Sequence, residues 1–230
     1  MGFKNHELFI KRHKNLFQGP ILEIGSRDYG STVNMRDLFP GEEYIGIDMQ
    51  EGKGVDHVID LTVPLADIDT VLGGSRFGTI ICLSVLEHCA QPFQMAENIT
   101  NLLRPGGRLY VSVPFSWKFH GYPSDYWRFT HEGVRKLFPR LVFDMTASRT
   151  STDVAGDLHP VDEELRRFRL KGSWQRRRGA VMHSIGADLV ALLGALGPLR
   201  WLTRHRYLMP PTCIEMIGTL PEGAGGSAPA

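Results

Sequence analysis

The fold can be predicted outward from one stretch near the start of the chain, Ile21-Leu22-Glu23-Ile24-Gly25, which is followed by Ser26-Arg27-Asp28-Tyr29-Gly30. A short apolar run that stops at a glycine is typical of a buried strand entering a tight turn. Gly25 has no Cβ, so this turn can pass close to a ligand. The stretch therefore predicts the first strand of a sheet, with a ligand-binding turn at its carboxyl end.

Further apolar runs alternate with stretches of helical spacing. A helix is expected from Ser31, whose hydroxyl can cap it, to just before Pro40, and another over residues 91–104, which Pro105-Gly106-Gly107 ends. A further helix is expected over residues 131–138. The other expected strands are residues 44–48, 55–61, 79–83, 109–113, 141–145 and 213–220. The pattern predicts an α/β fold, a Rossmann-like seven-stranded mostly parallel sheet with helices on both faces, plus a helical insertion before the last strand.

One connection departs from that scheme. Only six residues separate Asp48 from Val55. A parallel crossover normally needs a dozen or so residues. The second helix of the scheme is therefore expected to be missing or reduced to a turn.

Composition places the chain among ordinary globular proteins. Its 230 residues are 42% hydrophobic and 22% charged, with a net charge of +1, which excludes collagen-like, disulfide-stapled and disordered chains. Cys82, Cys89 and Cys213 form no CxxC pair, so neither a zinc site nor a disulfide framework is indicated. With no signal peptide in evidence, a cytoplasmic location is expected.

The turn after the first strand narrows the kind of ligand. Asp48 ends the second strand 23 residues after Gly25, where its carboxylate can accept hydrogen bonds from both hydroxyls of a ribose. A dinucleotide fingerprint needs a glycine where Arg27 stands, so that backbone can approach a pyrophosphate. The turn thus favours a nucleoside-containing cofactor without a pyrophosphate and makes a nicotinamide oxidoreductase the weaker alternative.

Two later segments complete the pattern. Ile80-Ile81-Cys82-Leu83-Ser84-Val85-Leu86-Glu87-His88 is followed by Leu103-Arg104-Pro105-Gly106-Gly107. Together with the first two strands, these segments resemble the class I S-adenosylmethionine-dependent methyltransferases, type 11 branch, over roughly residues 15–145. Some members of that branch accompany glycan or natural-product biosynthesis.

The resemblance implies S-adenosyl-L-methionine as cofactor and assigns its contacts. Glu23, Gly25, Ser26 and Arg27 would hold the methionine portion, although the family usually has glycine where Arg27 stands. The other contacts would be Asp48 with the ribose, Met49 with the adenine face, Asp60 and Leu61 with the adenine edge, and Leu83 and Ser84 where the pocket closes.

Two histidines are candidates for the general base that an alcohol or phenol acceptor needs. His88 follows the fourth strand. His120 lies in the aromatic loop, residues 114–130 after the fifth strand, with Tyr126, Asp125 and Arg128 as further candidate catalytic residues. The structural alternative is a packed lid held by an Asp125–Arg128 pair. No spacing requires a metal site among these side chains, and none is expected.

The chain from residue 147 to 211 is expected to be an insertion between the core (1–146) and the last strand (212–220), before a disordered tail (221–230). It should hold a charged helix over 162–171 and an apolar helix over 179–202. Residues 165–206 contain ten basic residues and only Asp188 as an acid, a net charge of +9. The insertion could serve as a cap over the acceptor, a homodimer element, or an interfacial helix on anionic lipid at the inner face of a membrane. Nucleic-acid binding is the weakest interpretation.

The expected activity is methyl transfer to a hydroxyl of a sugar, glycan intermediate or secondary metabolite, with a histidine base and the aromatic loop closing the site. Two alternatives stay open: an RNA methyltransferase that docks through the basic insertion, and a non-catalytic cofactor-binding module.

Overall fold

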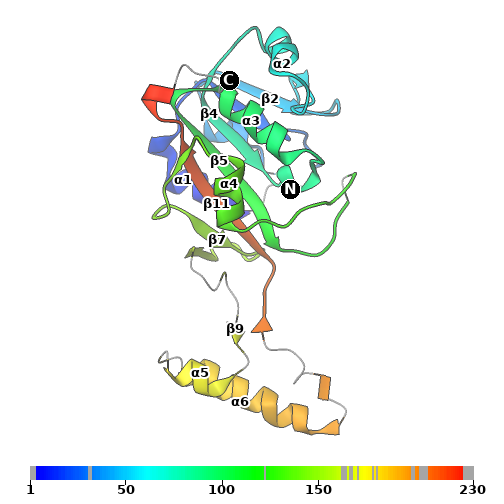
Figure 1. Cartoon of the computed structure of the whole chain (residues 1–230), viewed down its shortest axis with the longest axis vertical. Coiled ribbons are helices and arrows are strands. Elements are labelled where there is room, and N and C mark those ends of the chain that lie inside the picture. Colours follow the sequence, from blue (N-terminus) through cyan, green and yellow to red (C-terminus); the bar gives the residue numbers. More distant parts are fainter. Residues whose placement is uncertain are drawn as a thin grey trace. The chain divides into compact units, whose positions relative to one another are not determined.

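The computed structural model describes residues 4–30, 33–121, 123–161, 165, 168–169, 171–177, 179, 181–197, 200–201 and 207–224. The chain divides into two compact units. The core unit comprises Met1–Val161 and Pro211–Ala230, and the insertion unit comprises Asp162–Pro210 (Figure 1). Each unit is described by itself.

A mostly parallel sheet forms the centre of the core unit. Its strand order is β3-β2-β1-β4-β5-β11-β7-β8, and β6 also pairs with β11. The five strands from β3 to β5 run parallel, whereas β6, β7 and β8 join through antiparallel pairs around β11. The bounds are β1 Ile21–Ile24, β2 Tyr44–Asp48, β3 His57–Val58, β4 Phe77–Leu83, β5 Leu103–Ser116, β6 Val142–Phe143, β7 Arg149–Ser151, β8 Leu158–Pro160 and β11 Thr212–Thr219. The predicted Rossmann-like class is confirmed, with a nine-stranded sheet in place of the seven strands expected.

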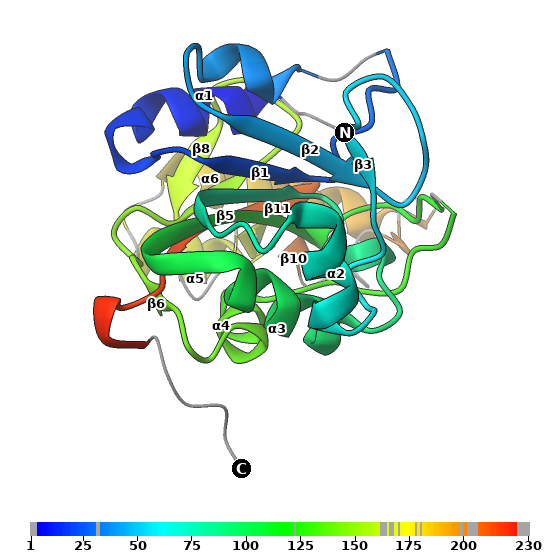
Figure 2. The ribbon, with the colours of Figure 1, turned by 90° about the horizontal axis from the view of Figure 1, so that it is seen from above.

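Helices cover both faces of the sheet (Figure 2). The helix α1 (Lys4–Arg12) lies on one face, and α2 (Leu65–Leu72), α3 (Pro92–Leu102) and α4 (His131–Leu137) lie on the other. On the α1 face, Phe9 stacks on Tyr110 with ring centroids 4.7 Å apart, inside a buried apolar cluster. Little in the sequence indicates α1, because charged residues surround its two core side chains, Phe9 and Ile10.

Three local predictions need correction. No helix runs from Ser31 to Pro40: residues 31–32 lie outside the described residues, and Asn34 caps a 3₁₀ turn, η2 (Met35–Leu38). The β-branched residues before Asn34 disfavour a longer helix. The expected strand 55–61 is reduced to β3, and α2 follows it unpredicted. As expected, no helix fills the connection between β2 and β3, where every residue is described. Residues 103–108 form a bulged start of β5 rather than a turn before it.

The insertion starts later than predicted. β7 pairs with β11, and β8 pairs with β7, so residues 149–160 extend the main sheet and the division falls after Val161 instead of residue 146. Without these strands, β11 would expose unpaired backbone groups along this edge. Of the expected charged helix, residues 162–164, 166–167 and 170 lie outside the described residues. Phe168–Arg169 is a strand, β9, paired with β10 (Tyr207–Leu208).

The insertion unit also contains two helices, α5 (Gly172–Arg177) and α6 (Val181–Ala195). α6 falls inside the predicted apolar helix. Across the described residues, no helix combines the length and the apolar character that crossing a membrane requires. The chain after β11 makes a short turn, η5 (Glu222–Ala224), and the predicted tail from residue 225 onward lies outside the described residues.

Candidate cofactor and acceptor site

The carboxyl ends of three neighbouring strands meet at one edge of the sheet. β1 lies between β2 and β4, and Ile24 is in register with both Ile47 and Cys82. The residues that follow these strands, Gly25, Met49 and Ser84, therefore begin at the same edge. In open parallel sheets, ligands bind beyond this edge.

The turn after β1 requires a glycine. Gly25 has a φ of 76°, and a Cβ built there would lie 2.5 Å from Cγ2 of Val85. Its N–H donates to the Ile47 carbonyl at 2.9 Å, which ties the turn to β2. The backbone thus passes through a space that no side chain at position 25 could share.

The side chain of Arg27 is held by the loop between β2 and β3. Its guanidinium donates to Oε1 of Gln50 and lies 5.1 Å from the ring centroid of Tyr29. The same loop returns to the turn, where the Asp28 N–H donates to the Lys53 carbonyl at 2.8 Å. Between these contacts, Oγ of Ser26 is buried and has no hydrogen-bond partner among the described residues. A buried hydroxyl without a partner suits a site that a polar ligand completes.

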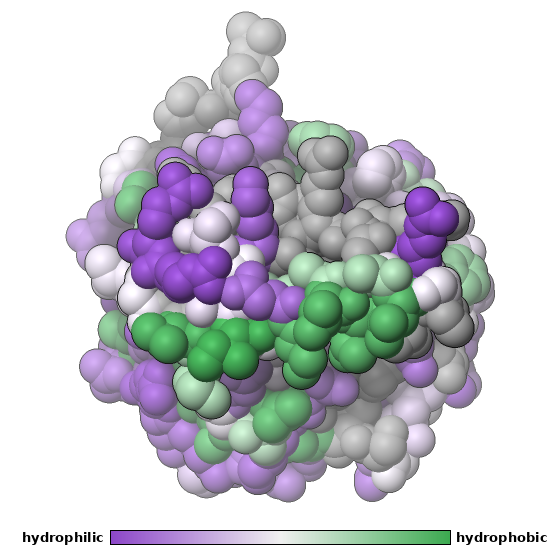
Figure 3. Space-filling view, turned by 90° about the horizontal axis from the view of Figure 1, so that it is seen from below, coloured by the Kyte–Doolittle hydropathy of each residue, from purple (hydrophilic) through white to green (hydrophobic). Residues whose placement is uncertain are grey.

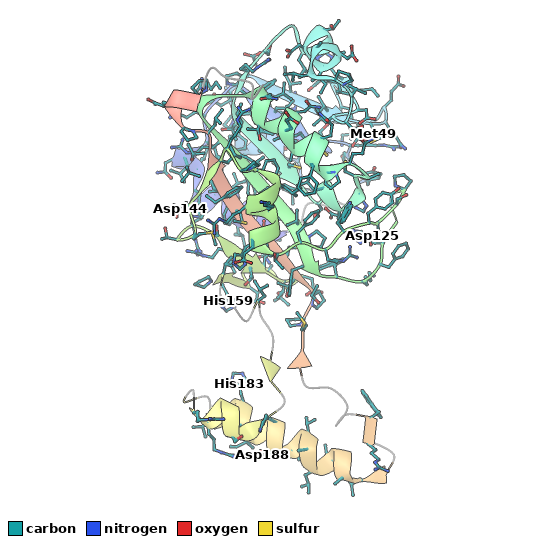
Figure 4. The ribbon with its side chains drawn as sticks, in the orientation of Figure 1. Met49, Asp125, Asp144, His159, His183 and Asp188 are labelled. Carbon is teal, nitrogen blue, oxygen red and sulfur yellow. The ribbon has the colours of Figure 1, made fainter. Side chains whose placement is uncertain are left out.

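The predicted acids and their neighbours lie at or just beyond the ends of β2 and β3. Asp48 is half-buried and accepts a hydrogen bond from the Gln50 N–H at 3.0 Å. Beside it, the side chain of Met49 is 67% exposed and lies on the same side of the core unit as Asp125 (Figure 4). Asp60 accepts from the backbone and hydroxyl of Thr62, and Leu61 is buried. The structure thus brings these four residues to the edge where Gly25 turns.

Glu23 lies on β1, just before the turn. Its carboxylate accepts a hydrogen bond from the Tyr44 hydroxyl at 2.8 Å. Burial raises the pKa of Glu23 to about 7, although the hydrogen bond from Tyr44 opposes that rise. The side chain can therefore change charge near neutral pH.

The aromatic loop after β5 is fastened to the turn after β4. The backbone N–H of Tyr126 donates to the Glu87 carbonyl at 2.8 Å, and Nε1 of Trp127 donates to the Cys89 carbonyl at 2.8 Å. Glu87 and His88 belong to that turn, η3 (Leu86–His88). These bonds bring His88 and His120, which are far apart in sequence, to the same place.

Asp125 organises the loop from within. Its carboxylate is fully buried and accepts hydrogen bonds from Arg128 at 2.5 and 2.7 Å and from the His120 N–H at 2.8 Å. The hydrogen bonds from Arg128 hold the pKa of Asp125 well below its usual range. Tyr126 contributes its backbone to the loop, whereas its side chain is 54% exposed.

The two histidine rings are 4.9 Å apart, edge to face. Nδ1 of His88 lies 2.5 Å from the Ser124 carbonyl, and Nδ1 of His120 lies 3.2 Å from both the Lys118 carbonyl and the Asp125 carboxylate. Because a carbonyl can only accept, each Nδ1 carries the hydrogen, and each neutral ring has its lone pair on Nε2. Burial lowers the pKa of His88 and so favours that neutral form.

Glu87 joins these rings, and no pattern in the sequence marks it as a site residue. One ligand atom each from Glu87, His88 and His120 lies within 4.8 Å of the other two. Glu87 precedes His88 in the turn after a buried strand, and that position was the available signal. Arg128 is paired with Asp125, which is the pair that the structural alternative predicts.

Comparisons with known proteins agree with the fold. No family model matches the chain. The chain is 29% identical over 68 residues to the Ubiquinone biosynthesis O-methyltransferase of Coxiella burnetii, a match that spans 29% of the chain and 29% of that protein.

Two solved structures cover most of the chain at low sequence identity. One is an S-adenosylmethionine-dependent methyltransferase from Archaeoglobus fulgidus, with a TM-score of 0.52, 14% identity, and coverage of 93% of this chain and 92% of that one. The other is the 1,6-didemethyltoxoflavin-N1-methyltransferase of Burkholderia thailandensis, solved with 1,6-didemethyltoxoflavin and S-adenosylhomocysteine, with a TM-score of 0.51, 12% identity, and coverage of 95% and 78%. The core unit thus has the Rossmann-like α/β fold of S-adenosylmethionine-dependent methyltransferases.

Proposed function

We propose that this chain is an S-adenosylmethionine-dependent methyltransferase. The observation that carries the proposal is the turn at Gly25, which no side chain can share, beside the Asp48 carboxylate at the end of the neighbouring strand. When bound, the cofactor supplies an electrophilic methyl group carried on a sulfonium sulfur.

The residues of the sheet edge suit the parts of this cofactor. Ser26 offers a buried hydroxyl in need of a partner, and Glu23 a carboxylate that can pair with the amino group of the methionine portion. In this proposal Asp48, at the end of β2, accepts hydrogen bonds from the ribose hydroxyls, and the exposed side chain of Met49 contacts the adenine face. Asp60, Leu61, Leu83 and Ser84 complete the proposed binding edge.

The acceptor we propose is a hydroxyl of a sugar, glycan intermediate or secondary metabolite. A hydroxyl must lose its proton as it is methylated, and a positioned base typically contributes ~10²- to 10⁴-fold. Nε2 of His120 is the proposed proton acceptor, since Asp125 and the Lys118 carbonyl orient the ring through Nδ1. His88 is the alternative base, oriented by the Ser124 carbonyl.

Calorimetric titration of the full chain with S-adenosylhomocysteine, with NAD as the comparison ligand, tests the cofactor assignment. We expect micromolar binding of the former and none of the latter. Asp48→Ala should weaken binding by about tenfold or more, because one charge-assisted hydrogen bond contributes ~1.5–3 kcal/mol. Asp67→Ala, an acid in the first turn of α2, is the matched control and should bind normally. Equal affinity for NAD, or an unaffected Asp48→Ala variant, would contradict the assignment.

Turnover with S-adenosylmethionine and a panel of hydroxylated acceptors tests the base. His120→Ala should keep its affinity for S-adenosylhomocysteine and lose about 10²-fold or more in kcat. An equivalent loss in His88→Ala alone would move the role to His88. Cofactor binding without turnover on any acceptor, including RNA, would instead support a non-catalytic binding module.

A further inference from the structure

We infer that Glu87, His88 and His120 form a binding site for a divalent transition-metal cation. This inference goes beyond methyl transfer, because cation binding does not depend on which reaction the chain performs. It rests on three independent features of the cluster: its ligand types, the orientation of both rings, and the state of the Glu87 carboxylate.

The ligand types and their separations match a three-ligand metal centre. Two imidazoles and one carboxylate suit first-row cations such as Zn²⁺, Co²⁺ and Mn²⁺, and a centre with three protein ligands keeps a position open for a substrate. The three ligand atoms lie within 4.8 Å of one another, and His88 Nε2 is 3.9 Å from Glu87 Oε1. Ligands about 2.0–2.1 Å from a tetrahedral Zn²⁺ lie roughly 3.3 Å apart, so small side-chain rotations would complete the centre.

Both rings already have the orientation of metal-binding histidines. A ligating histidine usually donates its other ring N–H to a carbonyl or carboxylate, which fixes the tautomer. His88 does so toward the Ser124 carbonyl, and His120 does so toward the Lys118 carbonyl and Asp125. The lone pair of each Nε2 is thereby available within the cluster.

The third ligand is the carboxyl of Glu87, which gains a negative charge when a cation displaces its proton. Its side chain is 1% exposed, and Oε2 has no hydrogen-bond partner among the described residues. An acidic oxygen buried in this way costs free energy unless a donor or a cation compensates it. A cation between Glu87 and the two rings provides that compensation.

A cation here would also change how an acceptor hydroxyl is activated. Bound cations polarise an oxygen and lower the pKa of its proton. With Nε2 of His120 engaged as a ligand, that effect would replace the base assigned to His120. The open position would favour acceptors with a hydroxyl placed to reach the cation.

The test is calorimetric titration with Zn²⁺ of the full chain, free of any polyhistidine tag and stripped with a chelator. We expect one Zn²⁺ per chain. Loss of a residue that only supports a metal ligand already weakens metal binding by about tenfold or more. Glu87→Gln and His120→Ala alter ligands themselves, so each should weaken Zn²⁺ binding by at least about tenfold. His159→Ala removes another histidine that pairs with a carboxylate, Asp157, and should bind Zn²⁺ as the unaltered chain does.

Circular dichroism on each variant establishes that it is folded, and visible absorption of the Co²⁺ form reports directly on the ligands. No Zn²⁺ binding, or equal binding in Glu87→Gln and His120→Ala, would overturn the site. Titration with S-adenosylhomocysteine on the same preparations separates the two proposals. A chain that binds S-adenosylhomocysteine but not Zn²⁺ overturns only the metal site, and a chain that binds Zn²⁺ but not S-adenosylhomocysteine overturns only the proposed cofactor.

A second inference concerns the insertion unit, where α6 exposes its large apolar side chains. Positions 181, 185, 189, 192 and 196 recur at spacings of three and four and so share one face of the helix. These residues, Val181, Ile185, Leu189, Leu192 and Leu196, are 53–67% exposed, and Met182 beside them is 79% exposed. Figure 3 shows a continuous hydrophobic band bordered by hydrophilic side chains.

The opposite face of α6 is buried and small. Ser184, Ala187 and Gly194 are its buried residues, and α5 packs against α6 within the unit. A helix normally buries its large apolar face. Within the insertion unit, that face stays exposed.

The geometry points to the surface of an anionic lipid bilayer as the partner of that face. The exposed basic residues Lys171, Arg176, Arg177 and Arg200 belong to the same unit as the apolar face, and Asp188, the acid on α6, is paired with Arg176. An apolar helix face together with basic residues is the combination that binds the interface of anionic membranes.

Co-sedimentation of the full chain with vesicles tests this assignment. We expect binding to phosphatidylglycerol-rich vesicles, little binding to pure phosphatidylcholine, and release at high salt. Ile185→Glu and Leu189→Glu should abolish binding, whereas Val71→Glu, a change at an exposed apolar residue of α2, should not. Absence of binding to the anionic vesicles, or a dimer in light scattering that Leu189→Glu converts to a monomer, would overturn the assignment; the dimer result would identify the partner as a second copy of the chain.

Discussion

The buried carboxylate of Asp125 accepts two hydrogen bonds from the guanidinium of Arg128, at 2.5 and 2.7 Å. The same carboxylate accepts from the backbone of His120 at 2.8 Å. A single ion pair thus fixes the loop that carries one of the two candidate histidines.

Removing Arg128 should destabilise this loop. Arg128→Ala leaves the Asp125 charge buried without its partner, and hydrogen bonds to charged groups contribute ~1.5–3 kcal/mol each. Urea unfolding should reveal a loss of at least that size. Arg76→Ala is the matched control, because Arg76 also forms two hydrogen bonds to one carboxylate, that of Asp69. Both of these side chains are more exposed than that of Asp125, so the change should lower the free energy of unfolding by under about 1 kcal/mol.

The same pair predicts how stability depends on pH. Because Arg128 holds the pKa of Asp125 below its unfolded value of about 3.9, the stabilisation is present above that value and is lost as pH falls. The free energy of unfolding should therefore fall more steeply below pH ~5 in the unaltered chain than in Arg128→Ala. Parallel curves would mean that the pair does not persist in solution.

Gly25 should not tolerate alanine. A residue other than glycine at this positive φ costs roughly 1–2 kcal/mol, and the clash with Val85 adds to that cost. Gly73→Ala, at a φ of 61° with nothing within 4 Å of the new Cβ, measures the backbone cost alone. We expect Gly25→Ala to be the more destabilised in urea unfolding and to lose affinity for S-adenosylhomocysteine. Partial recovery of stability in Gly25→Ala/Val85→Ala would verify the cause.

Cofactor affinity should rise with pH through Glu23. The pKa of about 7 means that this carboxyl gains its charge between pH 6 and 8, and the charged form pairs with the amino group of the cofactor. Titration with S-adenosylhomocysteine across that range should show the increase, and Glu23→Gln should flatten it. Tyr44→Phe removes the hydrogen bond that favours the charged form, so the midpoint should move upward. In the chain without ligand, the raised pKa of Glu23 makes the free energy of unfolding fall as pH rises. The stabilisation from the neutral carboxyl is fully present below the unfolded pKa and is lost as pH rises through about 7.

Glu215 should be essential for the packing of the sheet against α1. Its fully buried carboxylate accepts from the Tyr110 hydroxyl at 2.7 Å and from the Ser151 hydroxyl at 2.5 Å, and lies 3.5 Å from His6. Burial raises the pKa of Glu215, but the charge of His6 and these hydrogen bonds outweigh it and leave the pKa lowered. Glu215→Gln should therefore lower the free energy of unfolding by about 1–3 kcal/mol at neutral pH. The difference from the unaltered chain should shrink as pH falls below about 4. Glu222→Gln, at an exposed position, is the control.

Local patterns in the sequence are enough to predict the parallel part of the sheet and the edge proposed for the cofactor. The runs at 21–24, 44–48 and 79–83 are continuous and apolar, and a strand buried on both faces produces that pattern locally. Gly25, after the first run, and Asp48, at the end of the second, can be recognised without any tertiary contact. The connection without a helix between β2 and β3 followed from chain length alone.

The cluster beside that edge depends instead on contacts between residues far apart in the chain. Glu87, His88 and His120 come together because backbone groups of Tyr126 and side-chain atoms of Trp127 bond to the turn after β4, and no local period in the sequence encodes such contacts. Local sequence patterns do not predict α1, β7 or β8 either, because each of these elements is stabilised by pairing or packing with residues far along the chain. Local spacing specifies which face a segment can bury, whereas long-range packing selects the partners that bury it.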